Sequence, residues 1–372
     1  MSEEVELDIE HRIDDIARSE PKRFECRHLR SVVAQIFGAV GSNAHESERL
    51  AHYLVEANLA GHDSHGVIRV TYYVDYVRRG QIQVNQRAVV VHETDCMLVV
   101  DGGSGFGQVV GEDAMQLTAT KCAQSGVCVV AIRNCGHLGR IGDWPMLLAQ
   151  QGMASLHFVN TTGYGILVAP FGGIDRRLSA NPIAAGIPRS GAAPIILDIS
   201  TAAIAEGKLK VARNKGASAP DNCLIDAQGQ PTNDPNAFYA EPPGAILAFG
   251  GHKGYGLGLI AEIMAGALTG SGCSRPGAER LLNGMLSIAI DPQRIPREFD
   301  FTAEIESFIA YVKSSRPTRP GQLILVPGEL EEQTRAERTR DGVPLDGATQ
   351  KALRATMKRL SLGEDLLVPL QT

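Results

Sequence analysis

Apolar residues recur at two different intervals along the chain, and the interval changes near residue 88. From Leu29 to Ala60 and again from Val67 to Arg79 they fall three or four apart, the spacing of a helix with one buried face. Gly41, Ser42 and Asn43 interrupt the first stretch, and the latter two favour helix starts. From about residue 88 onward, short apolar runs alternate with helical stretches. This alternation predicts a layered α/β domain that follows a helical segment.

The alternating part resolves into elements of ordinary length. Strands are predicted at 88–91, 97–100, 127–133, 154–159, 195–199 and 246–249, and helices at 109–124, 140–151, 201–212 and beyond 254. Past residue 272 the pattern predicts strands at 285–290 and 322–326 and helices at 302–314, 329–340 and 347–361.

Composition and charge exclude several classes of protein. The 372 residues include 36 Lys and Arg against 42 Asp and Glu, a net charge of −6, which argues against a nucleic-acid partner. No apolar stretch reaches the roughly 20 residues of a membrane helix, so we expect no membrane partner. The seven cysteines form no CxxC pair, which favours a reducing, cytoplasmic setting.

Standard cofactor and metal motifs are missing from the sequence. We find neither a GxGxxG after a strand nor a GxxxxGK[ST], so an ordinary Rossmann or P-loop site is disfavoured. There is no HExxH, and His62 and His65 lie three apart without a clear third ligand. We therefore predict no metal site, although a metal-dependent lyase that uses His62, Asp63 and His65 stays open as an alternative.

Two segments combine histidine with groups suited to an anionic substrate. His65, Arg69 and Tyr73 are spaced by four and would form one stripe on a helix beginning near Ser64, with Arg as a two-pronged partner for a carboxylate. A capped helix with a solvated polar face is the alternative, and the spacing alone favours it. His137 follows a buried strand between flanking glycines, where an imidazole is a plausible acid or base. An ordinary loop histidine is the alternative.

Two further segments suit a phosphate. Leu197–Thr201 ends a strand, and Ser200 or Thr201 would begin a helix whose first N–H groups face a ligand. In Phe249–Gly256, glycines allow close approach of the backbone and Lys253 supplies a point charge. Ordinary capping and an ordinary glycine-rich turn are the alternatives.

Taken together, the segments carry a resemblance that none of them carries alone. These segments are GHDSHGVIRVTYY, RNCGHLGRIGDW, SANPIAAGIP, LDISTAAIAEGK, FGGHKGYGLGLIAEIMAGALTG, NGMLSIAID and a late PGE. In this order they resemble the malate/L-lactate dehydrogenase family that is unrelated to the Rossmann enzymes. The resemblance covers about residues 27–361 and is specific for the family rather than for a substrate.

The resemblance implies an oxidoreductase that uses NAD or NADP, has a non-Rossmann α/β fold with a mixed sheet, and forms a homodimer with the active site near the subunit interface. Residues 1–24 have no counterpart in the family, and we expect them to be an N-terminal extension. The domains that we expect are a helical, dimerisation domain made of 25–87 with 272–372 and a cofactor-binding α/β domain over 88–271. The catalytic positions that the resemblance implies are His137 as the proton acceptor, Arg69 as the carboxylate clamp, and His65 and Tyr73. The cofactor-binding positions that it implies are Gly139, Arg140, Asn160, Asp198, Ser200, Thr201, His252, Lys253, Gly328 and Glu329.

These expectations lead to one main hypothesis for the reaction. A hydride would pass between the nicotinamide and C2 of a small 2-hydroxy or 2-oxo acid, while His137 exchanges the hydroxyl proton. The stretch Gly139–Gly142 resembles the hydroxycarboxylate dehydrogenase branch and favours a malate- or lactate-like acid. A reductase of a cyclic imino acid and a non-catalytic nucleotide-binding protein are the alternatives.

Overall fold

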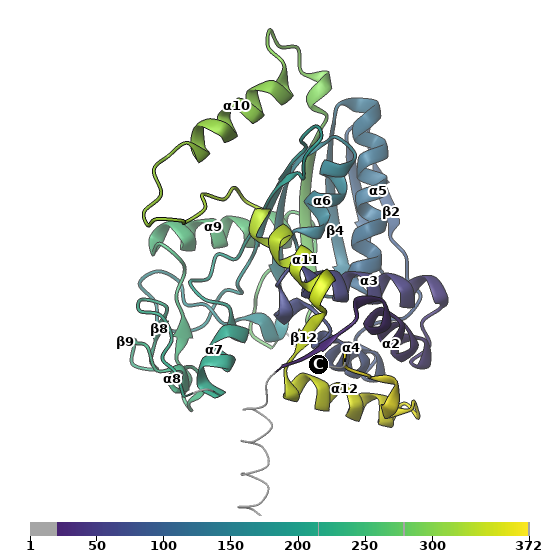
Figure 1. The fold of residues 1–372 in the computed structure, drawn as a ribbon, viewed down its shortest axis with the longest axis vertical. Helices are drawn as coiled ribbons and strands as arrows, with labels where there is room; N and C mark the ends of the chain where they lie inside the picture. Colours follow the sequence, from purple (N-terminus) through teal and green to yellow (C-terminus); the bar gives the residue numbers. More distant parts are fainter. Residues whose placement is uncertain (1–20, 215, 278–279, 371–372) are drawn as a thin grey trace, which may run out of the picture. The chain divides into compact units, whose positions relative to one another are not determined.

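The computed structural model describes residues 21–214, 216–277 and 280–370 and divides the chain into two compact units (Figure 1). Unit 1 comprises the chain up to Asn85 together with Glu331 and all that follows. Unit 2 comprises Gln86–Leu330. Each unit is described by itself below.

Unit 1 is mainly helical and joins the two ends of the chain. Its helices are α2 (Cys26–Ala39), α3 (Ala44–Leu59), α4 (Arg69–Arg78), α12 (Gly347–Arg359) and most of α11 (Glu329–Asp341). Strands β1 (Lys22–Phe24) and β12 (Val343–Leu345) pair antiparallel and tie the N-terminal part to the C-terminal part. The predicted helix start at Asn43 is confirmed, because its side chain accepts a hydrogen bond from the Glu46 N–H at 2.9 Å.

Unit 2 is built on a mixed seven-stranded sheet with the order β2-β3-β4-β11-β5-β6-β7. Its strands are β2 (Val89–Glu93), β3 (Met97–Asp101), β4 (Val127–Cys135), β5 (Ala154–Thr161), β6 (Ile183–Ile187), β7 (Ile195–Ile199) and β11 (Asn283–Ile290). Only the β3–β4 pair is parallel among these neighbours, and α5 (Gly107–Ser125) connects it. The predicted mixed-sheet α/β fold is therefore confirmed.

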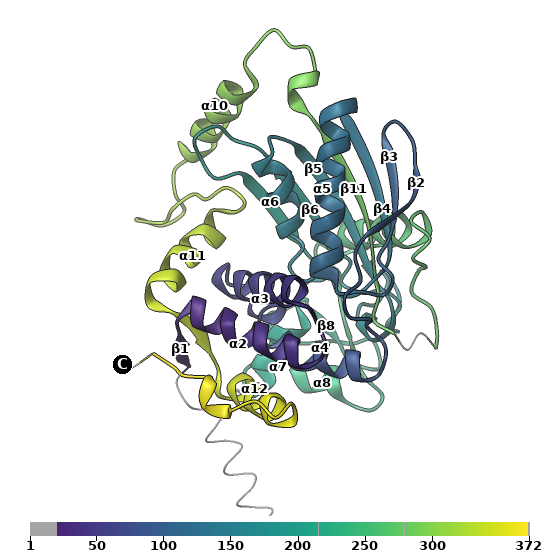
Figure 2. The same ribbon diagram turned by 90° about the vertical axis from the view of Figure 1, so that its right-hand side faces the viewer.

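Helices cover both faces of this sheet. Helices α5 and α6 (Asp143–Gln150) pack against each other, and Figure 2 shows them side by side on the sheet. Gly186 of β6 faces α6, and Gly284 of β11 faces the π-helical turn η3 (Ile263–Ala267) that follows α9 (His252–Glu262). The β5 partners of these glycines, Ser155 and Asn160, are five residues apart, so they point to opposite faces.

Smaller elements complete the described part of unit 2. A second sheet, of order β10-β8-β9, contains β8 (Leu224–Ile225), β9 (Pro231–Thr232) and β10 (Ala245–Ile246), and lies with α7 (Glu206–Asn214) and α8 (Pro235–Tyr239) over a small core. Unit 2 also contains helix α10 (Phe301–Lys313) and the 3₁₀ turns η2 (Gly163–Gly165) and η4 (Pro292–Arg294). Unit 1 has η1 (Asp63–His65) and η5 (Glu364–Leu366). Within the described ranges, no helix has the length and apolar character needed to cross a bilayer.

The structure corrects the predicted domain boundary at residue 272. Strand β11 lies in the centre of the sheet of unit 2, so the chain returns to unit 1 only near Glu331. The predicted strand at 322–326 is wrong, because this segment has no strand partner. Of the predicted extension over 1–24, residues 1–20 lie outside the described ones, and Lys22–Phe24 form β1.

A buried histidine in the sheet predicts how stability depends on pH. His157 of β5 is fully buried; its Nδ1 lies 2.7 Å from Ser287 Oγ and its Nε2 lies 2.9 Å from Ser155 Oγ. Burial lowers the pKa of His157 from 6.5 to about 3. Between these two values the unfolded chain binds a proton that the folded chain does not, so stability falls as the pH falls, by up to about 1.4 kcal/mol per pH unit.

We expect H157Q, which does not titrate, to flatten this dependence. The measurement is the free energy of unfolding of both proteins between about pH 6 and pH 4.5. The same slope in H157Q and in the unsubstituted protein would contradict the expectation.

Candidate active site

The polar segments of unit 2 gather at one edge of the large sheet. In the antiparallel ladders, Asn283 at the start of β11 pairs with Cys135 at the end of β4 and with Thr161 at the end of β5. Ile183, which begins β6, pairs with Ile199, the last residue of β7. Strand ends carrying four of the predicted segments therefore meet at this edge, which we call the polar edge. Ligands in α/β proteins commonly bind where strands end at their carboxyl side.

His137 stands at the polar edge in a loop whose main chain is held on both sides. Its side chain is half-buried. The Gly136 N–H donates to the Gly105 carbonyl at 2.9 Å, and the Leu138 N–H donates to the Asn283 side-chain oxygen at 2.8 Å. A Cβ on Gly107 would lie 2.2 Å from the His137 carbonyl oxygen, so glycine is required there for α5 to begin against this loop. The imidazole is thus presented from a fixed backbone.

The loop after His137 is tied to the end of β7. Arg140 is 3% exposed, and its Nη1 donates to Asp143 Oδ1 at 2.9 Å. Asp198 Oδ2 accepts from the Gly142 N–H at 2.7 Å. These two predicted cofactor residues are thus engaged within the protein, and Asp198 ties the end of β7 to the loop that follows His137. Gly139, with a φ of 75°, turns the chain between His137 and Arg140.

Asn160 is part of a buried network rather than a free polar group. It is 0% exposed; its amide donates to Glu262 Oε1 at 3.2 Å and to the Gly272 carbonyl at 2.9 Å, and its oxygen accepts from the Gly284 N–H at 3.1 Å. Both its amide nitrogen and its oxygen are therefore bonded to protein groups. Asn160, one of the predicted cofactor-binding positions, is therefore engaged within the protein through these contacts.

Ser200 and Thr201 do not begin a helix, contrary to the prediction. Helix α7 starts at Glu206, and both hydroxyls donate to the Ala180 carbonyl at 3.1 Å. The first-turn N–H groups that would cradle a phosphate are thus not at Thr201. The two residues instead fix the end of β7 to the start of β6.

The start of α9 has features that fit a phosphate-bearing cofactor. Gly250 and Gly251 have φ values of 58° and 62°, and the helix begins at His252 with no side-chain cap on its N-terminal N–H groups. His252 and Lys253 are exposed. Two of these N–H groups already have backbone partners, because the Lys253 N–H donates to the Gly250 carbonyl at 3.4 Å and the Gly254 N–H donates to the Phe249 carbonyl at 3.1 Å. The exposed lysine and the positive end of the helix are the features suited to phosphate oxygens. The predicted segment thus offers a positive charge and a helix N-terminus on the surface of unit 2.

Sequence analysis did not single out Phe171, which lies beside His252 at the start of α9. Phe171 is 64% exposed, and its ring lies edge-on to the His252 ring at a centroid distance of 5.8 Å. An exposed phenylalanine in a loop gives no periodic signal, and only its neighbouring Gly172-Gly173 pair resembles the glycine pair that precedes His252.

Gly328 and Glu329 lie near β7 and α10. The Pro327 carbonyl accepts from the Ile196 N–H at 3.1 Å, and Gly328 has a φ of 98° at this approach. Glu329 Oε1 accepts from Lys313 Nζ at 2.5 Å, and this hydrogen bond holds the pKa of Glu329 below its usual value. The Glu329 carboxylate is therefore paired within unit 2.

The histidine segment of unit 1 is organised around Asn58. This buried side chain accepts from the Val67 N–H at 2.8 Å and donates to Asp63 at 2.6 Å, and a Cβ on Gly66 would lie 2.2 Å from its oxygen. Both oxygens of Asp63 also accept from Arg338, at 2.6 and 3.1 Å. The lyase alternative needs Asp63 as a metal ligand, and this arginine pairing disfavours it.

The predicted stripe of His65, Arg69 and Tyr73 is only partly present. Helix α4 begins at Arg69, while His65 ends the separate turn η1. His65 and Arg69 are half-buried, and Arg69 Nε donates to the Ser64 carbonyl at 2.6 Å, which fixes the plane of the guanidinium. Tyr73 is 1% exposed and packs near Phe37, so its phenol belongs to the core and not to a polar stripe.

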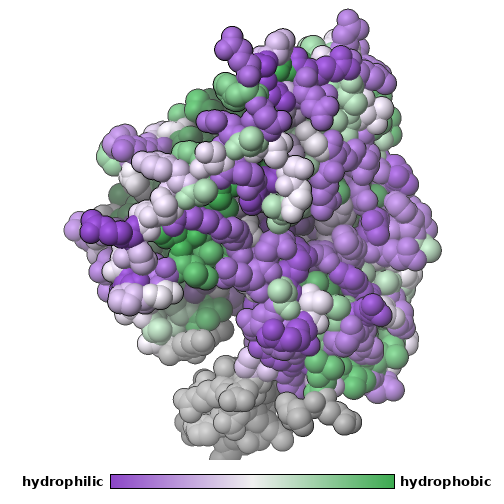
Figure 3. Space-filling view, turned by 45° about the horizontal axis from the view of Figure 1, so that its top comes forward, coloured by the Kyte–Doolittle hydropathy of each residue, from purple (hydrophilic) through white to green (hydrophobic). Residues whose placement is uncertain are grey.

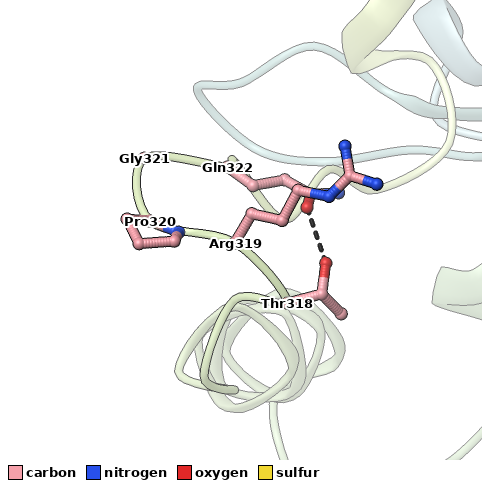
Figure 4. A pocket seen from close by; sticks show the side chains of 5 residues that line it. All are labelled: Thr318, Arg319, Pro320, Gly321 and Gln322. Atoms are coloured by element: carbon pink, nitrogen blue, oxygen red, sulfur yellow. Dashed lines mark hydrogen bonds between the residues drawn. The ribbon is translucent and has the colours of Figure 1, made fainter.

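A hollow elsewhere in unit 2 lacks the chemistry of a site. It measures about 560 Å³ and is lined by Thr318–Gln322, one exposed loop (Figure 4). Its internal hydrogen bond joins Thr318 Oγ1 to Gln322 Oε1 at 2.6 Å. None of the predicted site residues lines it, so we do not regard it as the active site.

The fold and the polar edge define an α/β protein in which a histidine lies at a strand end and no Rossmann motif is present. The family model for malate/L-lactate dehydrogenase matches residues 24–354. The chain therefore belongs to the malate/L-lactate dehydrogenase family. This confirms the resemblance inferred from the sequence segments.

Individual relatives agree with the family. The chain is 39% identical to hydroxycarboxylate dehydrogenase B of Escherichia coli strain K12 over 350 residues, which cover 93% of this chain and 96% of that one. Its structure resembles that of a candidate malate/lactate dehydrogenase from E. coli, with a TM-score of 0.88, 38% identity and coverage of 92% and 96%. It also resembles delta1-piperideine-2-carboxylate reductase from Pseudomonas syringae pvar. tomato, with a TM-score of 0.78, 28% identity and coverage of 93% and 99%.

Proposed function

We propose that the protein catalyses reversible oxidation of a small 2-hydroxy acid to a 2-oxo acid with NAD or NADP. The observation that carries the proposal is the half-buried His137 at the polar edge of a chain that belongs to this family. The names of its relatives, hydroxycarboxylate, L-lactate and L-sulfolactate dehydrogenase, support a small anionic substrate.

Each role in this proposal falls to a residue already described. The nicotinamide, when bound, supplies or accepts the hydride at the substrate C2. His137 takes the hydroxyl proton during oxidation and returns it during reduction. Arg69 pairs with the substrate carboxylate. His65 is the second polar residue of unit 1 that we assign to the active site. The exposed Lys253, at the start of α9, pairs with cofactor phosphate.

The first test is turnover against a panel of substrates. We would follow the absorbance of NADH and of NADPH with pyruvate, oxaloacetate, 2-oxoglutarate, a sulfonated 2-oxo acid and one cyclic imine. Turnover of at least one 2-oxo acid is expected and would identify both the cofactor and the substrate class. Cofactor binding without any turnover would instead support the non-catalytic alternative.

The likeness to the piperideine carboxylate reductase favours one second candidate. A cyclic imino acid also has a carboxylate beside the carbon that accepts hydride, so the same Arg69 and His137 would serve. Turnover of the imine with none of the 2-oxo acids would replace our proposal by this one.

Arg69→Lys is expected to raise KM for the acid about tenfold or more while kcat changes less. Lysine keeps the positive charge but loses the planar fork that binds a carboxylate at two points. The measurement is the KM for the best acid of the panel, with the dissociation constant of the cofactor as a control. An unchanged KM would remove Arg69 from carboxylate binding.

We also propose that the protein is a homodimer in a reducing compartment, the cytoplasm. Exposed apolar side chains support the first part: Phe308 and Tyr311 of α10 are 63% and 76% exposed, and hydrophobic residues interrupt the mainly hydrophilic surface in Figure 3. All seven cysteines are free thiols, which supports the second part.

Light scattering on the full chain tests the dimer. We expect twice the chain mass of 39.8 kDa, and a shift towards one chain mass for Phe308→Glu, because a charge on α10 would oppose burial of this surface. A monomer at micromolar concentration would contradict the proposal.

A further inference from the structure

One of the sequence segments, Asn283–Asp291, has no role in the reaction as proposed so far. Its first residue, Asn283, begins the central strand β11 and is 2% exposed. Its side chain makes three hydrogen bonds at the polar edge. The oxygen accepts from the Leu138 N–H at 2.8 Å, and the amide donates to the Asn160 carbonyl at 2.8 Å and to Thr161 Oγ1 at 2.9 Å.

We propose that Asn283 is a positioning residue for His137, holding the main chain beside this histidine to the last residues of β5. The proposal rests on the role proposed above for His137. Asn283 is not itself offered as a group that touches the substrate, because its amide and its oxygen are already bonded to protein.

The loop needs such a support because regular pairing ends just before it. The register between β4 and β11 shifts between Ile132 and Cys135, and Asn134 has a φ of 50° there. A bulge of this kind redirects the strand, and Cys135 is the last residue of β4 that still pairs with β11. The flanks of His137 are then held by Gly105, through Gly136, and by Asn283, through Leu138. Of these two contacts, only the one from Asn283 can be removed by a side-chain substitution.

The position of Asn283 is itself fixed by the sheet and by the turn η3. Asn283 lies between β4 and β5, and the residue after it, Gly284, faces η3 so closely that a Cβ would lie 2.1 Å from the Ala265 carbonyl oxygen. Asn283 therefore has little freedom to shift. A displacement of about 1 Å of a catalytic group lowers turnover by roughly 100-fold, so loss of this bond should reach the chemical step.

We would test the proposal with a double-mutant cycle of Asn283→Ala and His137→Ala. The N283A variant is expected to lower kcat about 10- to 100-fold, with little change in the dissociation constant of NADH or NADPH. In the H137A background the same substitution should change kcat less than about threefold, because the group that Asn283 positions is gone.

Ser287→Ala is the matched control. Ser287 is a buried polar residue of the same strand and bonds to His157 instead of to the loop. It is expected to lower Tm about as much as N283A but to leave kcat unchanged. An effect of N283A on kcat that is equal in both backgrounds, or equal to that of S287A, would overturn the proposal.

A second readout does not depend on turnover. The rate at which diethyl pyrocarbonate modifies His137, followed by peptide mass spectrometry, should rise several-fold in N283A and stay constant in S287A. Should N283A not fold, Asn283→Leu, which keeps the size but has neither the acceptor for the Leu138 N–H nor the amide donor, passes through the same cycle under the same criteria. If H137A retained full kcat, the proposed function would fail, whereas an unchanged modification rate would refute the positioning role alone.

Discussion

Replacing His137 by alanine is expected to lower kcat for the best substrate of the panel by about 10²–10⁴. A positioned acid or base contributes this much to proton transfer, and an alanine leaves water to replace it without fixed geometry. The loop backbone is held by Gly105 and Asn283 independently of the imidazole, so the variant should fold and bind cofactor as before. The measurement is kcat together with KM and the cofactor dissociation constant.

His92 offers the matched control for this substitution. It is an exposed histidine on β2, in the same unit, and H92A should leave kcat unchanged. If H137A and H92A had the same kcat, His137 would not be the acid or base, and the assignment of the reaction to the polar edge would lose its main support.

Gly284→Ala is expected to destabilise the protein by about 3 kcal/mol or more. The new Cβ would lie 2.1 Å from the Ala265 carbonyl oxygen, 2.7 Å from Ser271 Cβ and 2.8 Å from Asn160 Oδ1. The Ala265 carbonyl belongs to the backbone, and β11 is fixed between β4 and β5. Neither η3 nor β11 can therefore shift without a loss of stability. Unfolding in denaturant, followed by circular dichroism, measures the loss.

Gly256→Ala provides the comparison. No atom lies within 4 Å of a Cβ at this helical position, and alanine favours a helix over glycine by about 0.5–1 kcal/mol. We therefore expect G256A to be as stable as the unsubstituted protein or slightly more so. Equal stability of G284A and G256A would show that η3 does not constrain the strand as described.

Elements with strong local signals were predictable from the sequence. Asn43 gives the start of α3 because a side-chain cap is a local interaction, and the apolar run at 127–133 gives β4. Strand β6 was not predicted, because its segment IAAGI has little alternation and stands after a proline. The start of α7 was placed five residues early, because Thr201 is of a capping type but is engaged by the Ala180 carbonyl.

The candidate site was predictable in its parts but not in its contacts. The position of His137 after a buried strand follows from local pattern, and the resemblance adds its role. The sequence does not indicate that Asn160 points into a buried network, that Tyr73 lies in the core, or that Asn283 bonds to the loop 145 residues before it. These facts depend on tertiary pairing between distant segments, which periodicity does not report.

The position of β11 also has a consequence for how the protein is made. Strands β4 and β5 both lie within the first 161 residues, yet the strand that separates them ends at Ile290. During synthesis, a long stretch of chain must therefore emerge while the inner edges of β4 and β5 have no native partner. Fragments that stop before Asn283 would keep those edges open, and non-local pairing of this kind is slow to form. The central strand is thus the last strand of the sheet to be synthesised, and the polar edge cannot be complete before it emerges.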